Sequence, residues 1–259
     1  MKHSLSLIAL ILTAGTAGIG HAAEDLTVVS NVTANGKPGG IDTTYISGDH
    51  IRHSESQGND VIIDLKTGTM TNINEKKKTY FVVTKQDLET MQAKMAERMN
   101  DPKMKQAMAM MQGLGSSMAS STEVKKTGVT RKVAGFACEE WLISMGGMMT
   151  MTECVTNDLK YPVQSWAAMA DFNESMRKTM SGFGPSAKAG ADYAEKMKSI
   201  KGFPVATSST VEAGAMKITT SSEVTEIRRD PIPVSTWQVP PGFTQVENPM
   251  MKSMRESGR

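Results

Sequence analysis

The chain has 259 residues and a formal net charge of +2 at pH 7. A charge this close to balance supplies no basic field for nucleic acid or for an anionic membrane surface. Aromatic residues make up only 5% of the chain whereas methionine occurs 22 times, so methionine supplies part of the bulk that Phe and Leu usually provide.

The first 22 residues are typical of a cleaved secretory signal. Lys2 and His3 open the chain, an apolar run covers 5–19, and small residues precede a cut after Ala22. The run is too short to span a bilayer, and no later run approaches that length. We therefore predict a signal peptide over 1–22 and a soluble periplasmic protein with no transmembrane segment in the mature chain. No Cys follows the cut, so no lipid anchor is expected.

Short strands separated by tight turns are predicted between residues 26 and 83. Runs of β-branched residues alternate with turns such as Asn35-Gly36 and Gly48-Asp49. The expected strands are 26–33, 43–47, 50–54, 61–63, 70–73 and 79–83. Because consecutive strands with tight connections pair with their neighbours, we expect an antiparallel meander.

The pattern changes to that of an amphipathic helix between residues 85 and 112. Apolar residues recur there at three- and four-residue spacing on a charged background. Asn100-Asp101-Pro102 interrupts the pattern, because proline disfavours a helical residue before it, so two helices are predicted. The methionines of this stripe are Met91, Met95, Met99, Met108 and Met111.

The rest of the chain is predicted to alternate again between strands and helices. Strands are expected at 132–134, 136–144 and 148–156, helices at 163–180 and 186–200, and a final hairpin from 203–210 and 216–228. An extended segment over 231–242 and a disordered tail over 248–259 follow. With no linker and no repeat, residues 23–247 are interpreted as a single α+β domain.

The two cysteines are predicted to form a disulfide. Cys138 and Cys154 lie on the two strands of a hairpin that turns near Gly146. A three-residue loop of 145–147 would place them directly opposite each other, near the separation that a disulfide needs. Export to an oxidising compartment favours the same pairing, and neither a C-x-x-C spacing nor a nearby His indicates a redox or metal role.

The same register sorts the side chains of this hairpin onto two faces. One face is apolar and carries Trp141, Ile143, Met149, Met151 and Val155. The other carries Cys138, Glu140, Thr150, Thr152 and Cys154. Glu139 and Glu153 would oppose each other at the far end of the apolar face, where a carboxylate pair can share a proton or a cation but is usually screened by water.

No combination of residues is typical of an active site. The mature chain has two histidines, His50 and His53, whose spacing on a strand points them to opposite faces. Signatures of zinc proteases, α/β-hydrolases, P-loops and dinucleotide-binding sites are missing. We therefore predict a protein that is not an enzyme, with no catalytic residues, no cofactor and no metal ligands.

The methionine stripe has several interpretations. A stripe at helical spacing is by default part of the core. Thioether side chains also form a soft apolar surface that adapts to ligands of varied shape or to a partner segment. Met sulfur can bind Cu(I), although no His accompanies these residues.

Six short segments together resemble a family of bacterial envelope proteins. They are Tyr45-Ile-Ser-Gly-Asp-His-Ile-Arg52, Val61-Ile-Ile-Asp64, 73–80, Val133-Ala-Gly-Phe-Ala-Cys138, Gly202-Phe-Pro-Val205 and Pro240-Pro-Gly-Phe243. The pattern resembles domain-of-unknown-function family 4412, whose strands look like those of the LolA/LolB lipoprotein-carrier superfamily. This resemblance implies a curved antiparallel sheet, an open half-barrel with helices packed on its concave side, and an apolar cavity between them that suits acyl chains.

Together these observations predict a periplasmic protein that binds a hydrophobic or lipid-like ligand. An interaction or stress-sensing module that docks an envelope protein partner is the alternative, and a methionine-rich Cu(I)-handling protein is the third interpretation. Nucleic acid is not an expected partner. The predicted hydrophobic face combines Met91, Met95, Met99, Met108, Met111, Trp141, Ile143, Met149 and Met151.

Overall fold

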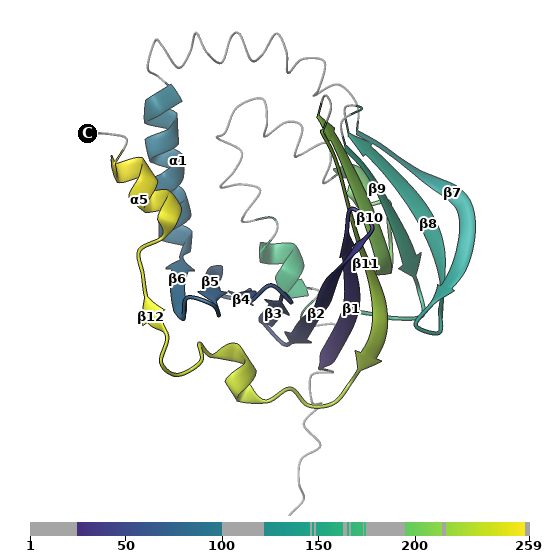
Figure 1. The fold of residues 1–259 in the computed structure, drawn as a ribbon, viewed down its shortest axis with the longest axis horizontal. Coiled ribbons are helices and arrows are strands. Elements are labelled where there is room, and N and C mark those ends of the chain that lie inside the picture. Colours follow the sequence, from purple (N-terminus) through teal and green to yellow (C-terminus); the bar gives the residue numbers. More distant parts are fainter. Residues whose placement is uncertain are drawn as a thin grey trace, which may run out of the picture.

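The computed structural model describes residues 25–99, 122–145, 149–162, 195–213 and 216–256, with positions 147, 165, 167–172 and 174 between them. These residues are mostly strand with a few helices, and their twelve strands form one curved sheet that is not closed into a barrel (Figure 1). The strand order across the sheet is β12-β6-β5-β4-β3-β2-β1-β11-β10-β9-β8-β7.

The first six strands form the predicted antiparallel meander. They are β1 (Leu26–Ala34), β2 (Lys37–Ser47), β3 (His50–Ser54), β4 (Asn59–Asp64), β5 (Thr69–Asn74) and β6 (Thr79–Val83). Helix α1 (Lys85–Met99) follows at once, as the sequence predicts. Thr84 and Asp87 cap its start reciprocally: the Asp87 N–H donates to Thr84 Oγ1 (3.1 Å), and the Thr84 N–H donates to Asp87 Oδ2 (2.8 Å).

The other long strands form a second antiparallel series. They are β7 (Thr122–Val133), β8 (Phe136–Met145), β9 (Met149–Thr156), β10 (Phe203–Ala213) and β11 (Met216–Arg228). The sequence predicted only 132–134 of β7, because most of this strand is exposed and lacks apolar alternation. Pairing with β8 imposes the extended conformation on it. β1 pairs with β11 and joins the two series into one sheet.

Strand pairing assigns the side chains to two faces, which we name after Val28 and Cys154. Val28 shares its face with Val32, two residues on along β1. From Val32 a row of paired residues crosses six strands on this Val28 face: Val32, Ser222, Thr207, Glu153, Trp141 and Lys126. The opposite, Cys154 face carries the row Asn31, Glu223, Ala206, Cys154 and Glu140.

The predicted disulfide between Cys138 and Cys154 is confirmed, with 5.3 Å between the two Cα atoms. The predicted register is wrong. Met145 pairs with Met149, so Cys154 lies opposite Glu140 and the disulfide runs diagonally across the two strands. Adjacent strands twist against each other, which shortens one diagonal of an antiparallel pair and lets cysteines that are not opposed meet.

The register error moves every pairing by two residues, so the two predicted faces of the hairpin are unchanged. It does separate the two carboxylates that were expected to oppose each other. Glu139 pairs with Val155, and Glu153 pairs with Trp141. The expectation of a Glu139–Glu153 pair is therefore wrong.

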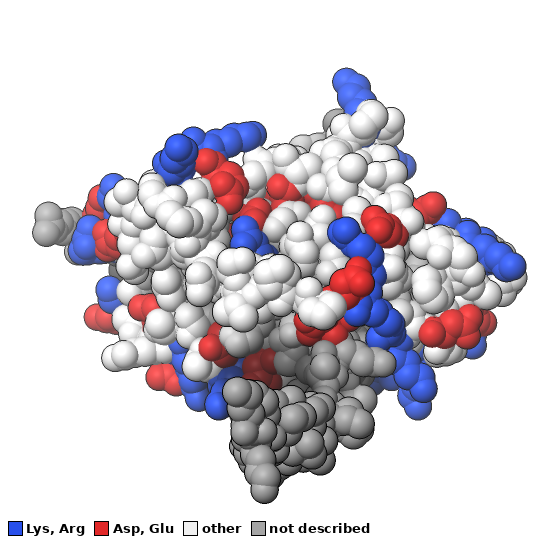
Figure 2. Space-filling model, turned by 90° about the horizontal axis from the view of Figure 1, so that it is seen from below, with Lys and Arg blue, Asp and Glu red and all other residues white. Residues whose placement is uncertain are grey.

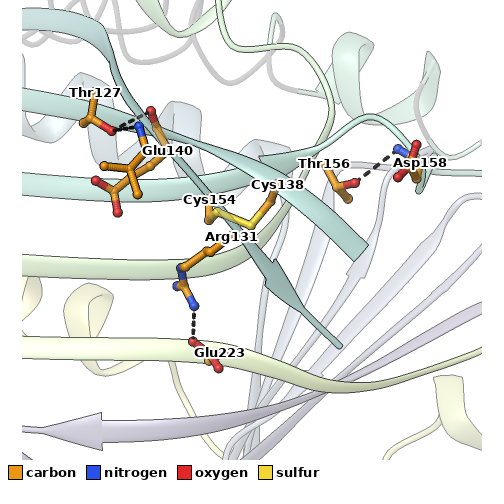
Figure 3. Close-up of a disulfide and its surroundings, with 9 residues drawn as sticks. Thr127, Arg131, Cys138, Glu140, Cys154, Thr156, Asp158 and Glu223 are labelled. Carbon is orange, nitrogen blue, oxygen red and sulfur yellow. Dashed lines mark hydrogen bonds and ion pairs between the residues drawn. A yellow bond between two sulfur atoms is a disulfide. The ribbon is translucent and has the colours of Figure 1, made fainter. Parts of the chain in front are cut away.

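The second strand series curls toward the Cys154 face near the disulfide (Figure 3). Arg131 on β7 and Glu223 on β11 both lie on this face, and Arg131 Nη1 is 2.7 Å from Glu223 Oε2. Three strands separate β7 from β11 in the sheet, yet Cα atoms of β7 lie within 8 Å of Cα atoms of β11. This curvature encloses the disulfide, and both cysteines belong to the buried core.

The residues from 231 to 246, here called the C-terminal strap, run along the first strand series (Figure 1). The strap contains the 3-10 helix η1 (Val234–Trp237) and β12 (Thr244–Gln245). Trp237 packs on His50, with 5.4 Å between the ring centroids, and Arg52 Nη1 donates to the Thr236 carbonyl (2.9 Å). β12 then pairs parallel with β6. The extended segment predicted over 231–242 therefore includes a helical turn.

Helix α5 (Pro249–Glu256) follows the strap, where the sequence favoured a disordered tail over 248–259. Of the predicted helices at 163–180 and 186–200, the structure describes helical residues at 165, 167–172, 174 and 195–197. The predicted signal peptide and the helix expected after Asp101 lie outside the described residues. In the described part of the chain, no helix combines the length and apolarity that crossing a membrane requires.

Candidate functional site

Two apolar rows cross β8, β9 and their neighbours on the Val28 face. Met145 pairs with Met149, Met149 with Val211, and Val211 with Ile218. In the next row, Ile143 lies between Val124 and Met151. Ile143 is only 1% exposed, whereas Val211 is 36% and Ile218 is 41% exposed. The first row therefore ends at an open apolar margin, whereas Ile143 in the second row is covered.

The structure brings together four of the residues that the sequence assigned to a hydrophobic face. Trp141, Ile143, Met149 and Met151 occupy neighbouring positions on the Val28 face. Met91 lies on α1 and is half-buried. Met95 and Met99 also fall within α1, although their side chains are outside the described part. Met108 and Met111 lie outside the described residues.

A pocket of about 180 Å³ lies between β1, β2, β10 and β11. Val28, Val224 and Phe203 give it an apolar lining, and Ser30, Thr44, Thr207 and Ser222 add hydroxyl groups. For scale, an engineered apolar cavity of about 150 Å³ binds benzene. The sequence prediction did not include these residues, because they come from four strands and share no local spacing.

Glu153 is a carboxylate in the middle of the Val28 face. It lies between Trp141 and Thr207, and Thr207 also lines the pocket. Burial raises the pKa of the Glu153 carboxyl above its usual range. Burial, together with the negative charge of Glu153, raises the pKa of Tyr161 to about 12. Tyr161 stacks on Phe203 with 4.6 Å between ring centroids, which connects Glu153 to the wall of the pocket.

Lys126 lies on the same row of paired residues as Glu153 and forms an ion pair with Glu139. Lys126 Nζ is 2.6 Å from Glu139 Oε2 and 5.1 Å from the centroid of the Trp141 ring. The contact with Trp141 is a cation–π interaction, and the contact with Glu139 neutralises the ammonium group. Lys126 therefore has Glu139, and not Glu153, as its ion-pair partner.

Replacing Glu153 with glutamine is expected to raise the melting temperature at neutral pH. A raised pKa means that the charged form is less favourable in the folded chain than in the unfolded one. Protonation of Glu153 therefore stabilises the folded chain at pH values below 4.5, the ordinary pKa of its carboxyl group. This stabilisation is lost as the pH rises through the folded-state pKa. The gain from E153Q should accordingly shrink as the pH falls from the raised folded-state pKa toward 4.5, and little of it should remain below that value.

Melting curves from pH 4 to pH 8 measure this difference, with E140Q on the Cys154 face as the control. Glu140 loses the same charge from the same hairpin. A neutral-pH melting temperature of E153Q at or below that of the wild type would contradict the prediction.

The two histidines do not form a shared site. His50 contacts Trp237, whereas His53 Nδ1 lies 3.0 Å from Thr44 Oγ1 on the Val28 face. Among the described residues, no group of three or more His, Cys, Asp or Glu side chains is arranged to hold a metal ion.

Figure 2 shows acidic and basic side chains interspersed on the side that it displays, in keeping with the small net charge.

Three solved structures are similar to the chain at low sequence identity. A structure of PNGF-II has 12% identity and a TM-score of 0.40, with 92% of this chain and 34% of that chain covered. A structure of MucB has 11% identity and a TM-score of 0.34, with 84% and 58% covered. The Pseudomonas aeruginosa MucA/MucB complex has 10% identity and a TM-score of 0.37, with 84% and 56% covered. The chain thus spans between about a third and three fifths of those structures. No curated protein matches significantly.

The family comparison covers most of the fold described above. Residues 35–243 match the family described as a domain of unknown function, DUF4412. The match begins at the turn between β1 and β2 and ends just before β12. It therefore includes the pocket residues of β2, β10 and β11, the hairpin of β8 and β9, and most of the strap, whereas β1 precedes it. The chain belongs to the DUF4412 family, as the sequence segments predicted.

Proposed function

We propose that this chain is a non-enzymatic periplasmic protein that binds a hydrophobic, lipid-like ligand on the Val28 face. One observation carries the proposal: the apolar rows through Met149 and Met151 lie on the same face as the 180 Å³ pocket. A pocket with an apolar lining and a few polar groups is the usual form of a site for small ligands. Methionine side chains can repack around acyl chains of different shape.

We also propose that helical segments cover the Val28 face and complete the ligand site. Ser165 is fully buried and donates from Oγ to the Gly48 carbonyl (2.6 Å), which ties this segment to the β2–β3 turn. Lys196 donates to the Thr122 carbonyl at the start of β7. The burial of Ile143 supports the same arrangement, because an inward-facing side chain on an uncovered sheet would contact water.

The disulfide supports the proposed location. Disulfides persist in oxidising compartments and are rare in the cytosol, and Cys138 and Cys154 are joined in the core. The export signal that the sequence predicts over 1–22 supports the same location. Gel analysis of cell fractions with an antibody against the chain tests the periplasmic assignment.

Replacing Met149 with glutamate is expected to weaken ligand binding by about tenfold or more. The change would place an unpaired charge in the apolar row, and burying it against a hydrocarbon ligand costs free energy. Titration with a fluorescent acyl-chain probe measures the effect, and native mass spectrometry of the gently purified protein identifies lipid that co-purifies.

The control is Thr150→Glu, which adds the same charge to the adjacent position on the Cys154 face. Val211→Glu serves as a second test, because this position is exposed and we expect a charge there to disturb folding little. The proposal fails if no lipid co-purifies and the probe does not bind. Equal binding by M149E and T150E would instead place the ligand elsewhere, and recovery of a discrete protein adduct would favour a protein partner.

A further inference from the structure

Glu153 lies where the apolar rows and the pocket meet. Its cross-strand partners are Trp141 on β8 and Thr207 on β10. Thr207 lines the pocket, and Tyr161 connects Glu153 to Phe203 on the pocket wall. A ligand that filled the pocket with hydrocarbon and extended along this row would therefore bring its polar end close to the Glu153 carboxylate.

The charges around Glu153 favour a positive group at this position. Lys126, the basic side chain on the same row, is paired with Glu139 at 2.6 Å. Tyr161 is held in its neutral form, because burial and Glu153 raise its pKa to about 12. Within the described residues, no Lys, Arg or His forms an ion pair with Glu153. The row thus has one carboxylate whose charge no described side chain neutralises.

A carboxylate beside a partly apolar pocket distinguishes between amphiphiles by the charge of their head group. An ammonium group gains a charge-assisted hydrogen bond to Glu153, and such bonds are roughly twice as strong as neutral ones. The carboxylate of a fatty acid would instead be repelled by a like charge in a partly desolvated position. The affinity of a neutral alcohol would lie between those of the ammonium and carboxylate amphiphiles.

We infer that the Val28 face selects amphiphiles with a cationic amine head group, which pairs with Glu153 while the hydrocarbon chain occupies the pocket lined by Val28, Phe203 and Val224. This inference rests on the proposed function, since it assumes that the face binds a hydrophobic ligand. It adds the class of ligand and the residue that determines specificity.

Competition among three twelve-carbon amphiphiles tests the inference on the full mature chain. Dodecylammonium, dodecanol and dodecanoate are each titrated at neutral pH against a bound neutral fluorescent hydrophobic probe. The two ions are kept below their micelle concentrations and the alcohol below its solubility limit. We expect dodecylammonium to compete at a concentration about tenfold lower than dodecanoate. In E153Q this preference should disappear, so that dodecylammonium and dodecanoate compete at similar concentrations.

Glu140→Gln is the matched control, because it removes the same charge from the Cys154 face of the same hairpin and should retain the preference. Melting curves confirm that both variants are folded. If the probe binds but dodecanoate competes as well as dodecylammonium, or if E153Q keeps the preference, this inference is wrong and the proposed function stands. If the probe does not bind at all, the proposed function fails and the inference fails with it.

Discussion

Asp60→Ala is expected to lower the free energy of unfolding by about 3–5 kcal/mol, the usual cost of removing one partner of a buried ion pair. Arg52 Nη2 lies 2.5 Å and Nε 3.0 Å from Asp60 Oδ2, and the two side chains are only 13% and 7% exposed. Ser54 Oγ donates to the same oxygen (2.7 Å). Without Asp60 the guanidinium charge would remain buried with no counter-charge from this position.

Chemical denaturation of the variant and the wild type measures the loss. Glu212→Ala is the control, because its ion pair with Lys217 is exposed and its removal should change stability by about 1 kcal/mol or less. The double variant Arg52→Met/Asp60→Leu removes both charges and should be markedly more stable than Asp60→Ala. A loss as small as that of the control would show that solvent already screens this pair.

The same substitution should loosen the C-terminal strap. Arg52 also donates to the Thr236 carbonyl, so the ion pair holds the guanidinium in position for the strap. Hydrogen exchange should therefore become faster in residues 231–246 of Asp60→Ala. Exchange in the hairpin of β8 and β9 should stay unchanged and provides the internal reference.

Removing the disulfide is expected to destabilise the fold by about 3 kcal/mol. The bridge joins residues 16 positions apart, and closing a loop of this length restricts the unfolded chain by about that amount. The double variant Cys138→Ala/Cys154→Ala avoids leaving a reactive thiol. Thermal unfolding compares it with the wild type, and mass spectrometry of the unreduced protein before and after thiol labelling confirms the bridge.

Reduction of the wild type with a thiol reagent is the matched control and should produce a similar loss. Below its melting temperature, the double variant should still bind the acyl-chain probe, because the cysteines lie on the Cys154 face and the proposed site on the Val28 face. Two labelled thiols in the unreduced wild-type protein would contradict both the bridge and this prediction.

Local patterns in the sequence were sufficient for the positions of most strands. The turns at Asn35 and Gly48, for example, determine where β1 ends and where β2 begins and ends. Helix α1 was equally predictable, because its methionine spacing follows the helical period and Asp87 forms the cap with Thr84. β7 was largely missed, because an exposed edge strand does not need the apolar alternation that identifies a half-buried one.

In the hairpin of β8 and β9, the alternation of apolar and polar residues determines the face of each side chain, whereas the geometry of the turn determines the strand register. Alternation placed Trp141, Ile143, Met149 and Met151 on one face, and a register error of two residues leaves this assignment intact. The pairing itself depends on which residues form the turn, so the opposition of Glu139 and Glu153 was predicted wrongly. Glu153 was therefore misplaced, and its position next to Thr207 and Trp141 could be recognised only in the folded sheet.

By itself, the sequence determined the strand and helix periods, the two faces of each strand, the pairing of the cysteines and the family of the chain. Each of these depends on residues close together along the chain or on a pattern that repeats locally. Only the tertiary structure decided that β1 pairs with β11, that Arg131 reaches Glu223, that the strap contacts Arg52, and that four strands line the pocket. These contacts join residues far apart in sequence, and their geometry depends on sheet twist and curvature summed over many strands.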